Sequence, residues 1–264
     1  MTENNLNEIE KIKKTWNDHA DTYDSCYETF EGAVENYVDW ELLNKYLPKS
    51  KNAKILDAAG GTGRMALPLA KMGYSVTLCD ISPAMLNVAR RKTPGEKVSD
   101  KTGIAECDIR NLPFANESFD FVLCWDGHIE AANELIRVTR KAGTISIFLY
   151  NKWAAAIGNF YENPDSTLAL IESSPSYLES EKGKHRIVGI EEARDFLKAE
   201  GLRVIDIYAV CGWLDVLRIP EEVLKSRDWD EAFFKQITAM VLRLVKEPSI
   251  MGISRHLVLY GKKM

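Results

Sequence analysis

Residues 54–63, KILDAAGGTG, decide the fold: a short apolar run ends in a cluster of glycines. The apolar run predicts a buried strand, and the pattern of residues 64–71 predicts that a helix follows the glycine-rich turn. The alternation continues with expected strands at 75–79, 103–106, 119–124 and 144–150 and expected helices at 83–91 and 131–140. Strands separated by helices predict an α/β fold with a doubly wound parallel sheet and right-handed crossovers.

The rest of the chain predicts two further strands, which bring the sheet to seven. A helix at 190–200 separates the sixth strand, 203–210, from the segments that precede it, and the last strand is expected at 256–260. The whole chain, 1–264, is expected to form a single domain. Its expected parts are N-terminal helices (1–48, with a turn near 21–25), a cofactor-binding half (49–150) and two cap insertions (151–188, with a polar loop or cap at 159–184, and 212–252, with one or two helices at 221–246).

Composition excludes some classes of protein and leaves others open. The formal net charge of -5 carries no general signature of polyanion binding. Five cysteines are scattered without a C-x-x-C pair, so neither a disulfide framework nor a metal site is predicted. No apolar stretch approaches the ~20 residues that span a bilayer, so we expect a cytoplasmic protein that does not bind membranes. The oligomeric state has no signal in the sequence.

The glycine-rich turn and the carboxylate that ends the second strand predict a nucleoside-containing cofactor. Gly60, Gly61 and Gly63 allow a sharp turn and a close approach of the backbone to a ligand, and the next helix offers its first amides to polar groups. Asp80 follows Gly60 by twenty residues and can accept hydrogen bonds from both hydroxyls of a ribose. The cofactor is therefore expected across the carboxyl ends of the strands.

Two classes of cofactor fit this turn. Residues 61–66, GTGRMA, satisfy the G-x-G-x-x-A pattern of NAD-dependent oxidoreductases. Against that reading, Asp57 lies four residues before Gly61, where it can reach the loop amides or a ligand amine. Asp108 can accept a hydrogen bond from an adenine amino group while Ile109 packs on the ring. An NAD-dependent oxidoreductase and a non-catalytic nucleotide-binding module remain the alternatives, although no Tyr-x-x-x-Lys pair is present.

These motifs resemble the class I S-adenosylmethionine-dependent methyltransferases, whose signature runs D-x-G-x-G-x-G, an acidic residue, D-x-x-x-L-P-F and S-F-D. The resemblance covers residues 54–150 well and implies a Rossmann-like methyltransferase sheet with S-adenosylmethionine as cofactor. It implies that Gly61 and Gly63 hold the methionine end, Asp80 the ribose, and Asp108 with Ile109 the adenine. Ala59 replaces the usual first glycine. Further expected cofactor contacts are Tyr23, Asp57, Ala59, Gly60, Ile81, Met85, Cys124 and Trp125. Tyr23 has core packing as an alternative role, and Trp16 is expected in the core.

The second half is similar to the bacterial tRNA methyltransferases that esterify 5-carboxymethoxyuridine. Residues 150–151, 212–215, 247–250 and 255–258 carry this similarity. It implies that Arg255 binds an acceptor carboxylate and that Tyr150 lines the acceptor pocket, so these two are the catalytic candidates. A solvated strand-edge arginine and a core aromatic are the alternatives. The acceptor is expected to be a small molecule or a modified nucleoside, in tRNA or free.

The chemistry makes a catalytic base optional. Methyl transfer from a sulfonium is an in-line displacement, so alignment in a dry pocket supplies most of the catalysis. A carboxylate acceptor loses no proton, whereas an amine, a phenol or a carbon acid needs a base. The histidines are the base candidates, each with a surface or packing role as the alternative: His19, His128, His185 and His256. A tRNA substrate predicts a basic cluster of Lys152, Lys182, Lys184, Arg186 and Arg218, and a small metabolite predicts an apolar lid from 153–160 and 213–217.

Overall fold

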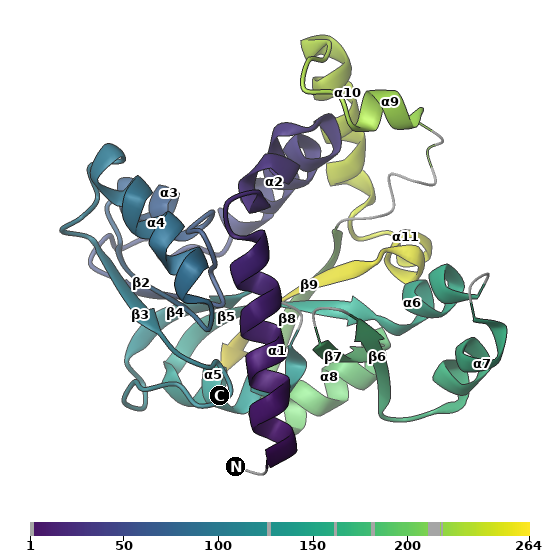
Figure 1. The fold of residues 1–264 in the computed structure, drawn as a ribbon, viewed down its shortest axis with the longest axis horizontal. Coiled ribbons are helices and arrows are strands. Elements are labelled where there is room, and N and C mark those ends of the chain that lie inside the picture. The colour runs from purple at the N-terminus through teal and green to yellow at the C-terminus, as the bar shows by residue number, and fades with distance from the viewer. Residues whose placement is uncertain (1–2, 126–127, 161–162, 181–182, 211–216, 218) are drawn as a thin grey trace.

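The structure, a computed structural model, describes residues 3–125, 128–160, 163–180, 183–210, 217 and 219–264. Five parallel strands form the centre of the sheet in the order β3-β2-β1-β4-β5 (Figure 1). They are β1 (Lys54–Ala58), β2 (Ser75–Asp80), β3 (Thr102–Glu106), β4 (Phe119–Cys124) and β5 (Thr139–Asn151). The doubly wound topology predicted from the sequence is confirmed.

Two more strands continue the sheet beyond β5. β9 (His256–Lys263) pairs antiparallel with β5 and with β8 (Leu202–Val210), so it lies between them. In this register Tyr150 of β5 faces His256 of β9. The seven expected strands are therefore all present, with β5 extending further at both ends than predicted.

A hairpin in the first cap insertion corrects the prediction of a polar loop at 159–184. It consists of β6 (Ser176–Ser180) and β7 (Gly183–Val188), and it brings the sheet of the described residues to nine strands. β4 ends opposite Ile147, so the last residues of β5 have a free edge, and β7 pairs there with Tyr150 and Asn151. Backbone hydrogen bonds make this pairing, which is why a polar sequence can supply it. The hairpin therefore continues the sheet beyond the carboxyl end of β4.

Helices cover both faces of the sheet because alternate strand residues point to opposite sides. Ile55 of β1 belongs to one core and its neighbour Leu56 to the other. The first core includes α2 (Phe30–Leu43), α3 (Ala66–Lys71), α4 (Pro83–Gly95) and α10 (Glu231–Leu244). The second includes α5 (Ala132–Val138), which follows the short η2 (Ile129–Ala131), and α8 (Ile190–Ala199).

The N-terminal helix α1 (Glu3–His19) crosses in front of the sheet and is followed by the short helix η1 (Tyr23–Glu28) (Figure 1). Lys13 forms an ion pair with Glu106 at the end of β3, 3.0 Å from nitrogen to oxygen. The Asn17 Oδ1 accepts hydrogen bonds from Ser82 Oγ (2.8 Å) and from the Ala84 amide (3.2 Å) at the start of α4. These contacts hold α1 across the carboxyl ends of β2 and β3.

The remaining helices lie at the sides of the sheet. α6 (Lys152–Asn159) and α7 (Pro164–Glu172) flank the β6–β7 hairpin, and α11 (Pro248–Ile253) precedes β9 (Figure 1). α9 (Glu221–Leu224) and α10 match the one or two helices expected at 221–246 and pack against α2, where Phe30 stacks on Phe233 with centroids 5.5 Å apart. No helix in the described part of the chain is long and apolar enough to cross a membrane.

Candidate cofactor and acceptor site

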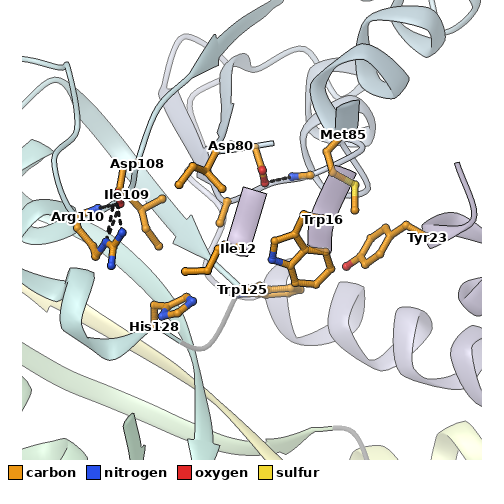
Figure 2. A pocket seen from close by; sticks show the side chains of 13 residues that line it. Ile12, Trp16, Tyr23, Asp80, Met85, Asp108, Ile109, Arg110, Trp125 and His128 are labelled. Atoms are coloured by element: carbon orange, nitrogen blue, oxygen red, sulfur yellow. Dashed lines mark hydrogen bonds and ion pairs between the residues drawn. The ribbon is translucent and has the colours of Figure 1, made fainter. Parts of the chain in front are cut away.

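A cavity with about 660 Å³ of empty space lies between α1 and the carboxyl ends of the central strands (Figure 2). Five segments supply its walls: α1 with η1, and the turns after β1, β2, β3 and β4. The lining residues are Ile12, Trp16, Tyr23, Ala59, Gly61, Asp80, Ile81, Met85, Asp108, Ile109, Arg110, Trp125 and His128.

The turn after β1 requires glycine for two reasons, lack of space for a side chain and a left-handed backbone. A Cβ on Gly60 would lie 2.3 Å from the Leu78 Cδ1 and 2.6 Å from the Asp57 Cγ, so no side chain fits there. Gly61 and Gly63 have φ angles of +54° and +84°, which favour glycine. Ala59 has a φ of +55° and adopts the same left-handed region at a steric cost. Gly60 and Gly63 therefore shape the turn, while Ala59 and Gly61 line the cavity.

Asp80 is held rigidly at the centre of the cavity. Its Oδ2 accepts a hydrogen bond from the Gly61 amide (2.9 Å) and its Oδ1 accepts one from the Ser82 amide (2.8 Å) (Figure 2). The residue is only 7% exposed. A carboxylate has about four acceptor positions, more than the two that these amides occupy.

The turn after β3 places Asp108, Ile109 and Arg110 together at another side of the cavity (Figure 2). The Arg110 guanidinium forms a two-point ion pair with the Asp108 carboxylate, with Nη2 2.7 Å from Oδ2 and Nε 3.0 Å from Oδ1. Burial raises the pKa of Asp108, but the hydrogen bonds and charge of Arg110 outweigh it and hold that pKa below its ordinary value. Asp108 is therefore an ionised acceptor beside the apolar Ile109 side chain.

Arg64 is a structural part of the site that sequence reasoning missed. Its Nη1 lies 3.0 Å from the Asp39 Oδ2 of α2, and its guanidinium carbon lies 4.4 Å from the Tyr27 ring centre and 5.7 Å from that of Trp125. It thereby ties the glycine turn to α2, η1 and a wall of the cavity. A signal was available in the sequence, because Arg64 directly follows Gly63 in the turn before α3.

Two buried carboxyl groups surround Arg64. Burial raises the pKa of Asp39 to about 6, although the charge and hydrogen bond of Arg64 oppose the rise. Burial likewise raises the pKa of Asp57 to about 7, again against the charge of Arg64. Asp57 lies below the turn, outside the cavity lining, so it supports the loop from beneath.

Other predicted cofactor residues divide between the wall and the interior. Tyr23 lines the cavity with its ring edge-on to Trp16, at 6.0 Å between centroids. Trp16, expected in the core, lines the cavity as well, and so do Ile81 and Met85. Cys124 ends β4 fully buried and outside the lining. Periodicity had marked one face of α1 as apolar, and only the fold shows that this face covers a cavity.

Six aromatic rings form a continuous arc that starts and ends at the cavity wall. Trp125 stacks on Phe148 at 4.7 Å and 11°, and its Nε1 donates to the Ser146 Oγ at 2.8 Å. The arc continues from Phe148 to His256 (6.1 Å), Tyr150 (4.9 Å), His185 (4.9 Å) and His128 (4.7 Å). Tyr150 thus lies behind the wall rather than in it, whereas His128 is exposed to the cavity.

Two other predicted residues lie away from this arc. Arg255 is an exposed residue just before β9, outside the cavity lining, and its carbonyl oxygen accepts from the Asn151 amide at 3.0 Å. His19 ends α1 on the surface, with its Nδ1 2.7 Å from the Thr15 carbonyl oxygen. The structure therefore brings Tyr150, but neither of these two, into the ring of side chains behind the cavity.

A tRNA substrate predicted a cluster of basic side chains, and its described members do not form one open basic surface. Lys152 is buried and donates to the Ser173 carbonyl oxygen at 2.7 Å, and Arg186 pairs with Glu192 at 3.0 Å. Lys184 is exposed and lies 4.6 Å from the Tyr177 ring centre. Lys182 and Arg218 lie outside the described residues.

A small-metabolite substrate predicted an apolar lid, and the large apolar side chains of its α6 part are exposed rather than packed over the cavity. Trp153, Ile157 and Phe160 are 45%, 68% and 55% exposed. In the other half of the expected lid, residues 213–216 lie outside the described residues, and Leu217 lines a separate groove beside α10. The described residues also contain no group of three or more His, Cys, Asp or Glu side chains able to hold a metal ion.

Comparisons with known proteins agree with this geometry. Residues 55–143 match a family described as a methyltransferase domain. The chain is 29% identical over 209 residues to the ubiquinone/menaquinone biosynthesis C-methyltransferase of Zymomonas mobilis, covering 74% of this chain and 85% of that protein. It is 23% identical over 256 residues to the tRNA 5-carboxymethoxyuridine methyltransferase of Escherichia coli, covering 90% and 92%.

A solved structure shows the same fold. The methyltransferase seen in complex with the Trm112 methyltransferase activator of Haloferax volcanii has a TM-score of 0.61 and 16% identity, covering 94% of this chain and 97% of that one. The matched family spans β1 to β5, which carry the glycine turn, Asp80 and Asp108. The chain is therefore a class I S-adenosylmethionine-dependent methyltransferase, with its methyltransferase domain at residues 55–143.

Proposed function

We propose that the cavity beneath α1 binds S-adenosylmethionine in one defined orientation. The observation that carries this proposal is the convergence of the glycine turn, Asp80 and the Asp108–Ile109 pair on a single cavity. Asp80 accepts the ribose hydroxyls, and Ile109 packs on the adenine while Asp108 accepts from its amino group. Ala59 and Gly61 leave space for the methionine end beside Trp125.

We further propose that the methyl group leaves toward the His128 and Trp125 side of the cavity, where the acceptor binds. That side is opposite the expected adenine contacts in the order of the strands, since Trp125 and His128 follow β4 whereas Asp108 follows β3. A small-molecule acceptor is favoured, because the buried Lys152 and the paired Arg186 contribute no open basic surface for a polyanion.

A carboxylate acceptor in a modified nucleoside is the second candidate. The Escherichia coli relative named for 5-carboxymethoxyuridine aligns over 90% of the chain. Under this proposal Arg255 reaches the acceptor carboxylate from the surface, and Tyr150 supports the acceptor side from behind the wall. The exposure of Arg255 requires the acceptor to bind partly outside the cavity.

Calorimetry with two ligands tests the cofactor assignment. S-adenosylhomocysteine, the product of the reaction, is titrated into the protein, and NAD is titrated in a parallel experiment. We expect binding of S-adenosylhomocysteine alone, and Trp16→Ala should weaken it because the indole lines the cavity. Trp153→Ala is the matched control, since Trp153 is an exposed tryptophan of α6 outside the cavity lining. Binding of NAD alone, or equal effects of the two substitutions, would contradict the assignment.

A further inference from the structure

The aromatic arc behind the cavity contains three of the four histidines of the chain. His128 follows β4, His185 lies in β7 and His256 begins β9, so three separate segments contribute to one cluster. Tyr150 at the end of β5 contacts both His185 and His256, with centroids 4.9 Å away in each case. The pairing of β5 with β7 and β9 on its two edges produces this arrangement.

Within this cluster, one histidine lines the cavity and a second, buried histidine packs against the first. His128 lines the cavity, whereas His185 is only 4% exposed and its ring centroid lies 4.7 Å from that of His128. Two imidazoles in contact do not both take up a proton easily, because like charges at this distance repel. A positive charge on one ring would therefore oppose a positive charge on the other.

Charged and titratable groups face His128 from two sides. Asp108 is the carboxylate that faces it across the cavity, and the positive charge of His128 contributes to the low pKa of Asp108. Arg110 forms an ion pair with Asp108 and lowers the same pKa. Behind His128, the facing groups are His185, then Tyr150 and His256. Imidazole is the side chain that most often acts as a general base, provided that it lies within reach of the acceptor proton.

We propose that His128 is the general base for a planar aromatic acceptor that carries an ionisable O–H, N–H or acidic C–H group. This inference rests on the proposed function. The planar class follows from the cavity walls, because the indoles of Trp16 and Trp125 line the same cavity as His128. His185 is a positioning residue, since it touches His128 rather than the cavity.

In the proposed step, the acceptor nucleophile forms a bond to the methyl carbon as the bond from that carbon to the sulfonium sulfur breaks. The electron pair of the broken bond stays on sulfur, which leaves neutral S-adenosylhomocysteine. The acceptor proton goes to an imidazole nitrogen of His128 and from there to solvent. A carboxylate acceptor would need no such proton transfer, so this mechanism separates the two acceptor classes.

The proton transfer can be observed with 4-nitrophenol, whose phenolate absorbs visible light. The probe is added to the complex of the protein with S-adenosylhomocysteine, in buffer below the pKa of the free phenol. We expect the ratio of phenolate to phenol to be at least ~10-fold higher for bound than for free probe in the wild type. His128→Gln and His128→Asn should bind S-adenosylhomocysteine with wild-type affinity and lose this increase.

His19→Gln is the matched control, because His19 lies on the surface at the end of α1 and outside the cavity lining. It should retain the wild-type spectrum. A phenolate signal that persists in both His128 variants would overturn the assignment of the base, and failure of 4-nitrophenol to bind the complex would overturn the acceptor class. Failure of the wild type to bind S-adenosylhomocysteine would instead contradict the proposed function, so the two failures are distinguishable.

Discussion

Asp80→Ala tests the centre of the cofactor site, and its effects can be worked out from the structure. The substitution removes the acceptor of two backbone amides, those of Gly61 at 2.9 Å and Ser82 at 2.8 Å. Ser82 is fully buried, so its amide loses its partner without gaining water, whereas the Gly61 amide lines the cavity and can be hydrated. At about 1–3 kcal/mol for one unsatisfied buried donor, the free energy of unfolding should fall by roughly 1–3 kcal/mol.

Cofactor affinity should fall separately from stability. Loss of the charged hydrogen bonds to the ribose should cost ~1–3 kcal/mol, which raises the Kd of S-adenosylhomocysteine about 5- to 150-fold. Urea unfolding measures the first effect, and calorimetry on the folded variant measures the second.

Asp120→Ala is the control for the first effect alone. Asp120 also accepts from a backbone amide, that of Lys54 at 2.7 Å, but it lies at the other end of the strands, away from the cavity. It should lose stability and keep its affinity. An Asp80→Ala variant that is folded and binds S-adenosylhomocysteine within threefold of the wild type would refute the placement of the ribose.

Three further substitutions test other parts of the site. Ala59→Gly should raise the free energy of unfolding by about 0.5–1 kcal/mol because it relieves a φ of +55°, and Ala142→Gly at +57° should behave alike; a loss in both would contradict this account. Asp57→Asn should flatten the pH dependence of stability. Burial raises the pKa of Asp57 from its ordinary value of 3.8 to about 7. The folded wild-type protein therefore has its full stability below pH 4 and loses stability as the pH rises from 4 to 7, because the unfolded chain releases this proton first. The loss in urea unfolding over that range should be smaller in the variant by on the order of 2 kcal/mol, and parallel profiles would count against it. Arg255→Ala should lower kcat/KM for 5-carboxymethoxyuridine by about 10- to 100-fold with unchanged affinity for S-adenosylhomocysteine if Arg255 binds the carboxylate; equal turnover in labelled-methyl assays would make it a surface residue.

The convergence of the strand-end residues on one cavity was largely predictable, for a geometric reason. The carboxyl ends of parallel strands meet at one edge of a sheet, so Gly61, Asp80 and Ile109 could be placed together from their positions at strand ends alone. Cys124 also ends a strand, yet its side chain is buried in the core. Which side of the sheet a terminal residue faces depends on where its strand stops, and sequence patterns locate that point only within a few residues.

The sequence by itself determined the alternation of strands and helices, the glycine turn and the carboxylates around it, because these depend on local periodicity and backbone freedom. Only the tertiary structure decided which helix covers the cavity and which strands pair with the edges of β5. The apolar face of α1 became a cavity wall through the contacts of Lys13 and Asn17 with distant residues. The cluster of His128, Tyr150, His185 and His256 exists because β5 pairs with both β7 and β9. Such pairing rests on backbone hydrogen bonds between segments far apart in the chain, and these leave little trace in the side-chain pattern.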